Sequence, residues 1–146
     1  MLQKLNTKRT GFTLVEIMIV VAIIALLAAI AVPNFLRSRK RSQATQVLED
    51  LRQIASAVDL YAIDTSRSSG FTADWSDVQK YIKTGTRLYG SSCEDLFGYY
   101  YGSISSTGSQ IVAGFFVDGT VTFNALAWNA LSDVAPAEFW SPYTYQ

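Results

Sequence analysis

The 146-residue sequence contains no histidine and a single cysteine, Cys93. Without histidine, neither a Ser/His/Asp nor a Cys/His nucleophile system can form, and there is no ordinary zinc site. The sequence also lacks a glycine-rich loop ending in Lys and Ser or Thr, which would cradle phosphate. No pair of carboxylates stands out for acid–base catalysis, and one cysteine permits no disulfide within the chain. We therefore expect a protein that is not an enzyme.

Charge of neither sign dominates, because 12 Lys and Arg residues balance 12 Asp and Glu residues. The distribution is nevertheless uneven. Basic residues flank residues 12–32, with three before this run and the cluster Arg37-Ser38-Arg39-Lys40-Arg41 behind it. From residue 66 onward, four basic residues face seven acidic ones. This mildly acidic region argues against a nucleic-acid partner.

Residues 12–32 form one long apolar run in which the only polar side chains are those of Thr13 and Glu16. At about 1.5 Å of rise per residue, a helix of this length just spans a bilayer. A cleaved secretory signal is one alternative, with Ala29-Ile30-Ala31 as its cleavage site, but its apolar stretch is normally shorter and carries no acid. A plain membrane anchor is another, but it leaves Glu16 unexplained. A carboxylate costs about 2.5 to 3.5 kcal/mol at the centre of a span and less near its end, so we expect Glu16 to have a partner.

The residues Gly11-Phe12-Thr13-Leu14-Val15-Glu16 follow a short basic leader and precede the apolar helix. This arrangement resembles the signature of type IV prepilins. The resemblance implies that Met1–Gly11 is a leader, that a prepilin peptidase cuts after Gly11, and that Phe12 becomes a methylated N-terminus. It also implies that Glu16 faces the N-terminal amine of a neighbouring subunit when the helices stack into a filament. Pairing would offset much of the cost of burying the carboxylate.

We expect the transmembrane helix to comprise residues 12–33 and to bend or locally unwind at Pro33, since proline removes a helical hydrogen bond. From residue 34 to 65 the pattern becomes amphipathic, with polar residues, including Asp50, on the remaining faces. The apolar positions that repeat at steps of three and four are Ala44, Val47, Leu48, Leu51, Ile54, Ala55, Val58 and Tyr61.

Residues 66–146 are expected to form a small globular head. The fold class is therefore α+β, a long N-terminal helix packed on a small antiparallel sheet, as in pilins. A helix is predicted to start at Asp74-Trp75-Ser76-Asp77. Strands are predicted at 97–104, 110–117 and 120–123, with Asp118-Gly119 as a hairpin turn between the last two. The aromatic C-terminal stretch is predicted to fold back over that sheet as a strap. Core and interface packing is preferred for these aromatic side chains over a sugar- or partner-binding surface.

The resemblance extends to the major pseudopilins of type II secretion systems, which carry a segment of the form Asp-Pro-Trp-Gly-Asn-Pro-Tyr. Residues 95–101, Asp-Leu-Phe-Gly-Tyr-Tyr-Tyr, keep the acid, an aromatic residue, the glycine and a tyrosine but lack both prolines. In that family, calcium is bound in the C-terminal loops. Asp118 and Asp133 are the candidate calcium ligands, since calcium prefers hard oxygen ligands. Asp118 has an alternative explanation as a turn residue.

The first expectation for function is a type II secretion pseudopilin, a filament subunit that supports protein secretion. Its implied partners are prepilin peptidase, further copies of itself, minor pseudopilins, the inner-membrane assembly platform and membrane lipid, with no nucleic acid. The head is then expected in the periplasm, on a single span of the bacterial inner membrane. One alternative is a type IV pilin for adhesion, motility or DNA uptake. Another is a membrane-anchored ligand-binding protein that never polymerises.

The basic cluster from Arg37 to Arg41 leaves three interpretations open. It binds DNA, it binds anionic lipid, or it lies just outside the bilayer and pairs with acids of neighbouring subunits such as Glu49 or Asp50. The last interpretation is preferred. Four cations follow the span and three precede it, so charge counting does not show which end of the span lies in the cytoplasm.

Overall fold

The computed structural model describes residues 11–67, 71–91, 93–107, 110–116 and 121–145. The chain divides into two compact units, Met1–Arg37 and Ser38–Gln146, and we call the second the head unit. Helix α1 runs from Leu14 to Thr65 and contributes to both. Pro33 lies inside α1 without interrupting it, so the local unwinding considered as one outcome for this residue is not seen. The loss of one backbone hydrogen bond leaves the turns on either side intact.

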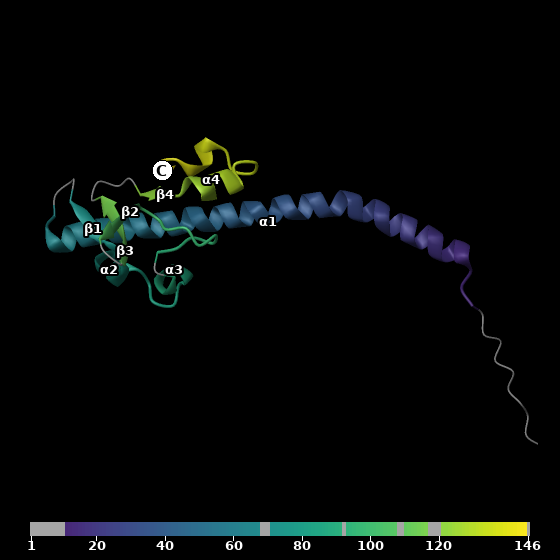
Figure 1. Ribbon diagram of the computed structural model, residues 1–146, viewed down its shortest axis with the longest axis horizontal. Coiled ribbons are helices and arrows are strands. Elements are labelled where there is room, and N and C mark those ends of the chain that lie inside the picture. Colours follow the sequence, from purple (N-terminus) through teal and green to yellow (C-terminus); the bar gives the residue numbers. More distant parts are fainter. Residues whose placement is uncertain (1–10, 68–70, 92, 108–109, 117–120, 146) are drawn as a thin grey trace, which may run out of the picture. The chain divides into compact units, whose positions relative to one another are not determined.

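The second half of α1 supplies one face of the core of the head unit. Figure 1 shows the short elements of the head gathered along this part of the helix. Seven of the eight apolar positions predicted for the stripe are buried, and Ala55 is partly buried. One expectation for the polar faces is wrong, because Asp50 is only 6% exposed. The buried residues of α1 are Ala44, Val47, Leu48, Asp50, Leu51, Ile54, Ala57, Val58 and Tyr61.

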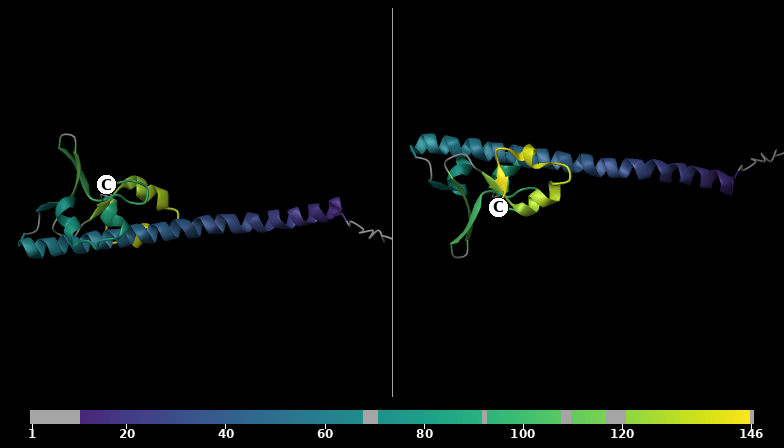
Figure 2. Two further views of the ribbon diagram at one scale, coloured as in Figure 1. Left: turned by 90° about the horizontal axis from the view of Figure 1, so that it is seen from below. Right: turned by 90° about the horizontal axis from the view of Figure 1, so that it is seen from above.

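The head contains a three-stranded antiparallel sheet. Its strands are β1 (Thr72–Asp74), β2 (Ser103–Thr107) and β3 (Gln110–Phe116), in the order β1-β3-β2. Both views of Figure 2 show the β2–β3 hairpin projecting from the rest of the head. A second, two-stranded sheet pairs β4 (Thr122–Phe123) with β5 (Thr144–Tyr145) in parallel. The expected antiparallel head is therefore only part of the architecture.

Two strand predictions need correction. The segment predicted as a strand from residue 97 is mostly turn and bend, and β2 begins only at Ser103. The strand predicted at 120–123 is not paired with β3, because β1 and β2 already occupy the two edges of β3. Its described part, β4, pairs with β5 instead. The predicted turn Asp118-Gly119 lies outside the described residues.

The helix predicted from Asp74 is present as α2 (Trp75–Val78), followed by the 3₁₀ turn η1 (Gln79–Tyr81). Gly85 lies beyond its end with φ +88°, a conformation that glycine adopts readily. A further short helix, α3 (Arg87–Gly90), begins after Thr86, whose hydroxyl accepts a hydrogen bond from the Tyr89 N–H. The sequence patterns did not predict α3.

The C-terminal stretch folds back as α4 (Ala125–Leu131), η2 (Ala137–Trp140) and β5. Trp140 is fully buried, and its indole nitrogen donates a hydrogen bond to the Ala135 carbonyl. Its ring lies 4.9 Å from that of Phe123 in β4, between ring centroids. The preferred packing role is confirmed for Trp140. In contrast, Tyr145 remains 51% exposed while stacking on Trp128.

Candidate processing and assembly site

Thr13 and Glu16 form a reciprocal hydrogen-bonded pair at the start of α1. The backbone N–H and hydroxyl of Thr13 donate to Glu16 Oε2 at 2.8 and 2.7 Å. The Glu16 N–H lies 3.3 Å from the hydroxyl oxygen of Thr13, which accepts its hydrogen bond. This is a capping box, in which Thr-x-x-Glu satisfies backbone groups that the first turn of a helix otherwise leaves unpaired. The helix therefore starts at Leu14 and not at Phe12.

The capping box changes how Glu16 is understood. A plain anchor offers this carboxylate no partner on sequence grounds, whereas in the structure Thr13 of the same chain donates two hydrogen bonds to it. Both hydrogen bonds from Thr13 end on Oε2, and a carboxylate has about four acceptor positions in all. Glu16 is also exposed. The capping box therefore leaves room for an amine from another molecule to bind the same carboxylate.

Gly11 is not required by the local packing. A Cβ atom added at this position would meet no heavy atom within 4 Å, and the backbone does not adopt a positive φ there. Fold stability therefore gives no reason for glycine at residue 11. A preference for glycine would have to come from something outside the chain that recognises this segment, such as a peptidase.

The first part of α1 exposes a continuous apolar surface. Among the described residues, α1 is the one helix long and apolar enough to cross a membrane. None of the most apolar stretch of this helix is buried within the structure. An exposed apolar surface of this extent is normally covered by lipid or by another protein. The large apolar side chains before Arg37 that are about half exposed or more are Phe12, Leu14, Val15, Ile17, Met18, Ile19, Val20, Val21, Ile23, Ile24, Leu26, Leu27, Ile30, Val32, Phe35 and Leu36.

Asp133, one of the two candidate calcium ligands, lies at the end of the α4 region of the head. Its carboxylate is 2.9 Å from the ammonium nitrogen of Lys40 in α1, and both side chains are partly exposed. The other candidate, Asp118, lies outside the described residues. No group of three or more His, Cys, Asp or Glu side chains suited to a metal is found in the part of the chain that the structure describes. The structure thus brings Asp133 to a cation, and the calcium site remains a prediction.

A buried charged cluster connects α1 to α3 and the following loop. Asp50 accepts hydrogen bonds from the Arg87 guanidinium and, at 3.0 Å, from the Tyr101 hydroxyl. Arg87 also donates to the Glu94 carbonyl at 3.1 Å. Burial raises the pKa of Asp50, and the positive charge of Arg87 and the hydrogen bond from Tyr101 partly oppose this shift. Asp50 is therefore unavailable to the basic cluster of a neighbouring subunit, which corrects that part of the expectation.

The segment at residues 95–101 is a tight loop organised by its acid. The Asp95 carboxylate is buried and accepts hydrogen bonds from the backbone N–H groups of Phe97 and Tyr99, at 2.7 and 2.9 Å. Gly98 has φ +81°, a conformation that favours glycine. Burial raises the pKa of Asp95, although these backbone hydrogen bonds oppose the shift. The two residues shared most clearly with the pseudopilin segment, the acid and the glycine, thus have structural roles here.

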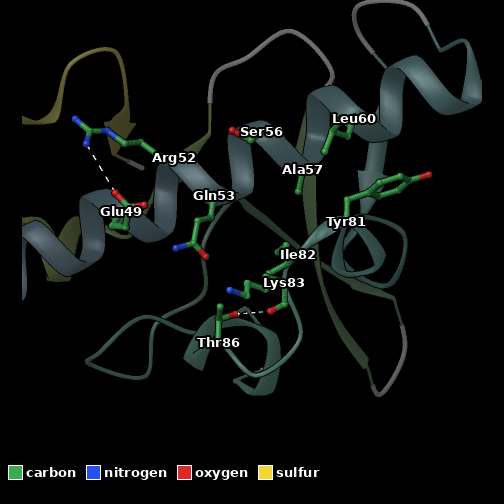
Figure 3. Close-up of a pocket in the computed structure, with 10 residues that line it drawn as sticks. All are labelled: Glu49, Arg52, Gln53, Ser56, Ala57, Leu60, Tyr81, Ile82, Lys83 and Thr86. Carbon is green, nitrogen blue, oxygen red and sulfur yellow. Dashed lines mark hydrogen bonds and ion pairs between the residues drawn. The ribbon is translucent and has the colours of Figure 1, made fainter.

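A surface groove of about 360 Å³ lies between α1 and the segment from Tyr81 to Thr86 (Figure 3). Glu49 and Arg52, on one wall, form an ion pair of 3.8 Å. Glu49 is the only carboxylate among the lining residues, so the groove lacks the carboxylate pair needed for acid–base catalysis. Its lining residues are Glu49, Arg52, Gln53, Ser56, Ala57, Leu60, Tyr81, Ile82, Lys83 and Thr86.

The start of the chain thus combines a basic N-terminal stretch, a glycine that packing does not require, a capped Glu16 and an exposed apolar helix, which are the features expected of a membrane-anchored precursor of the pilin type. A family model described as "Prokaryotic N-terminal methylation motif" matches residues 6–32. By this motif, the N-terminal region of the chain is that of the type IV pilin and type II secretion pseudopilin family. Members of this family are structural subunits, which confirms the expectation that the chain is not an enzyme.

The curated relatives fall into both branches of the family. The chain is 41% identical over 68 residues to the type IV major pilin protein PilA of Myxococcus xanthus, covering 47% of this chain and 31% of that protein. It is 38% identical over 60 residues to the type II secretion system core protein G of Klebsiella pneumoniae, covering 41% and 43%. It is 46% identical over 56 residues to the type IV wide pilus major component PilA4 of Thermus thermophilus, covering 38% and 43%.

The chain thus spans less than half the length of each of these relatives. The similarity is comparable in the two branches and does not decide between a pilus and a secretion system. No solved structure matches the chain. The family and the apolar first helix are consistent with a precursor anchored in the inner membrane.

Proposed function

We propose that this protein is a structural subunit of a pilus-like filament, made as a membrane-anchored precursor. In this proposal a prepilin peptidase removes Met1–Gly11 and methylates Phe12, and the apolar halves of α1 from many copies then pack together. The observation that carries the proposal is the combination of the N-terminal methylation motif with an apolar surface that no described part of the chain covers. Polymerisation would bury that surface against neighbouring helices.

Glu16 is proposed to pair with the N-terminal amine of a neighbouring subunit. The capping box supports this role, because it fixes the carboxylate at the first turn of α1 while occupying only Oε2. A fixed carboxylate loses less side-chain freedom when a partner binds than a mobile one would. The amine would be created by cleavage after Gly11, so pairing would require processing.

The experiment that tests this role compares three variants of the full chain in cells that contain a prepilin peptidase. Glu16→Gln removes the charge, and we expect cleavage to continue and filament formation to be lost. Thr13→Val removes the hydroxyl of the capping box but keeps the charge, and we expect a smaller loss. Lys83→Gln, in the surface groove, is the control and should assemble normally. Normal filaments from Glu16→Gln would refute the pairing.

For the branch of the family, a type II secretion pseudopilin is the first candidate. The loop from Asp95 to Tyr101 supports it, because the buried acid and the glycine that this loop shares with the pseudopilin segment both hold its shape. Such a subunit would span the inner membrane once, keep its head in the periplasm, and polymerise on an assembly platform with minor pseudopilins to support protein secretion. Calcium bound by Asp118 and Asp133 belongs to this proposal.

A type IV pilin is the second candidate, favoured by the identities of 41% and 46% to major pilus components. The two candidates can be distinguished by complementation, because each predicts that the chain restores function in a different mutant host. Expressed in a host lacking the major pseudopilin of its secretion system, a pseudopilin restores export of the secreted proteins. In a host lacking its major pilin, a pilin restores surface pili. Genes for a secretion ATPase and an outer-membrane secretin of one system beside this gene would point the same way.

A further inference from the structure

Three arginines lie on two opposite sides of α1 immediately after its apolar part, and we call Arg37, Arg39 and Arg41 the arginine collar. All three are exposed. The apolar surface continues up to Phe35 and Leu36, which are 68% and 51% exposed. The collar therefore begins at the residue where the apolar surface ends.

The collar arginines take part in no ion pair within the described part of the chain. Lys40, the fourth cation of the cluster, is held by Asp133. Of the two acids considered as partners from neighbouring copies, Asp50 is buried against Arg87, and Glu49 is paired with Arg52. The acids proposed for the collar are thus engaged elsewhere.

The arginines point in different directions around the helix. An α-helix turns by about 100° per residue, so Arg39 lies about 200° from Arg37, while Arg41 lies about 40° from it. A rigid duplex approaching from one side could contact only part of such a collar. Lipid headgroups surround a helix where it leaves the bilayer and can contact all of it. Arginine also binds phosphate through two parallel hydrogen bonds.

We infer that the arginine collar binds the phosphate groups of anionic phospholipids and sets the depth at which the unassembled subunit sits in the membrane. This inference rests on the proposed membrane-anchored precursor. It adds a lipid preference and names the residues responsible for it. Attraction to an anionic surface is worth about 1 kcal/mol per cation, which corresponds to about a fivefold change in affinity for each arginine.

The test uses the full chain in micelles of a zwitterionic detergent, titrated with phosphatidylglycerol, with bound lipid counted by native mass spectrometry. Phosphatidylcholine and inorganic phosphate are titrated in parallel, which separates a lipid site from a general phosphate site. We expect phosphatidylglycerol to bind more tightly than either. In the variant Arg37→Gln/Arg39→Gln/Arg41→Gln, its affinity should fall by about a factor of five for each arginine replaced.

The matched control is Arg52→Gln/Lys80→Gln/Lys83→Gln, which removes the same charge from three exposed cations of the head. It should bind phosphatidylglycerol as the unmodified chain does. An equal loss in both triple variants would overturn the proposal, because net charge alone would then explain the binding. Equal affinity for phosphatidylcholine would overturn it as well. Tighter binding of a DNA duplex, abolished by the collar variant, would assign the collar to nucleic acid instead.

The collar and the filament proposal can fail separately. Cleavage and filament formation are measured for the unmodified chain alongside the lipid titration. If the chain forms filaments but shows no preference for phosphatidylglycerol, only the lipid-binding proposal for the collar is overturned. If the lipid preference depends on the collar but the chain is never cleaved or assembled, only the filament proposal is overturned.

Discussion

Replacing Arg87 with methionine should destabilise the head by about 3 kcal/mol at pH 7. The change leaves the Asp50 carboxylate, which is 6% exposed, with the hydrogen bond from the Tyr101 hydroxyl but without its cation. Removing one member of a buried ion pair typically costs 3 to 5 kcal/mol, because the other charge stays buried without compensation. The Arg87 side chain is 32% exposed, which places the expected cost at the lower end of this range.

The cost of Arg87→Met should also depend on pH. Burial raises the pKa of Asp50 above its ordinary value of 3.8, and Arg87 is the strongest influence opposing that shift. Without Arg87 the pKa rises further, so the folded variant binds a proton more readily than the unfolded one. Stability contributed by this proton is present at low pH and is lost as the pH rises from about 3.8 through the raised pKa. The variant should therefore lose less stability at pH 4 than at pH 7, with a slope of up to about 1.4 kcal/mol per pH unit.

The assay is urea unfolding of the full chain in detergent, followed by tryptophan fluorescence. All three tryptophans lie in the head, at residues 75, 128 and 140, so the signal reports on this unit. Lys83→Met is the control, because Lys83 is exposed and forms none of the ion pairs among the described residues. It should change stability by less than about 0.5 kcal/mol. The double variant Asp50→Asn/Arg87→Met should lose less than Arg87→Met alone. A cost below 0.5 kcal/mol for Arg87→Met, or the same cost at pH 4 and pH 7, would refute the reasoning.

Two further predictions concern the core of the head. Leu51→Ala removes a fully buried side chain of α1 and should lower the free energy of unfolding by about 2 to 5 kcal/mol. Leu60→Ala, at a position that is 50% exposed, should cost less than half as much in the same urea assay, and equal costs would contradict the assigned core. Cys93 is buried, and burial raises the pKa of its thiol, so a thiol reagent at pH 8 should modify it only when the head opens. We expect labelling to be slower in buffer than in denaturing urea by a factor on the order of a hundred or more, and equal rates would show that Cys93 is accessible.

The long helix and most of its buried stripe could be predicted because they depend on local periodicity. Apolar residues at steps of three and four identified Leu51, Ile54 and Val58, and all three are buried. The capping box at Thr13 and Glu16 was missed, although the pattern Thr-x-x-Glu before an apolar run is visible in the sequence. The charge of Glu16 indicates a distant partner, whereas its spacing of three residues from Thr13 indicates a local one.

The features that could not be predicted depend on residues far apart in the chain. Asp50 looked like a surface residue because the partners that make its burial tolerable, Arg87 and Tyr101, lie 37 and 51 positions away. The short strand β4 was assigned to the wrong neighbour for a similar reason. Its partner β5 lies close to the C-terminus, and β1 takes the edge of β3 that a simple hairpin would have used. Local patterns carry no information about such choices.

The central claim is that the chain is a prepilin-type subunit, and the intact mass of the protein tests it most directly. The full chain is produced in cells that contain a prepilin peptidase, beside a Gly11→Val variant. A Cβ atom at residue 11 would meet no heavy atom within 4 Å beyond its chain neighbours, so this variant should fold normally and remain uncleaved. For the unmodified chain, the account predicts loss of Met1–Gly11 and the addition of one methyl group at Phe12. An uncleaved chain, or a cut near Ala31, would contradict it.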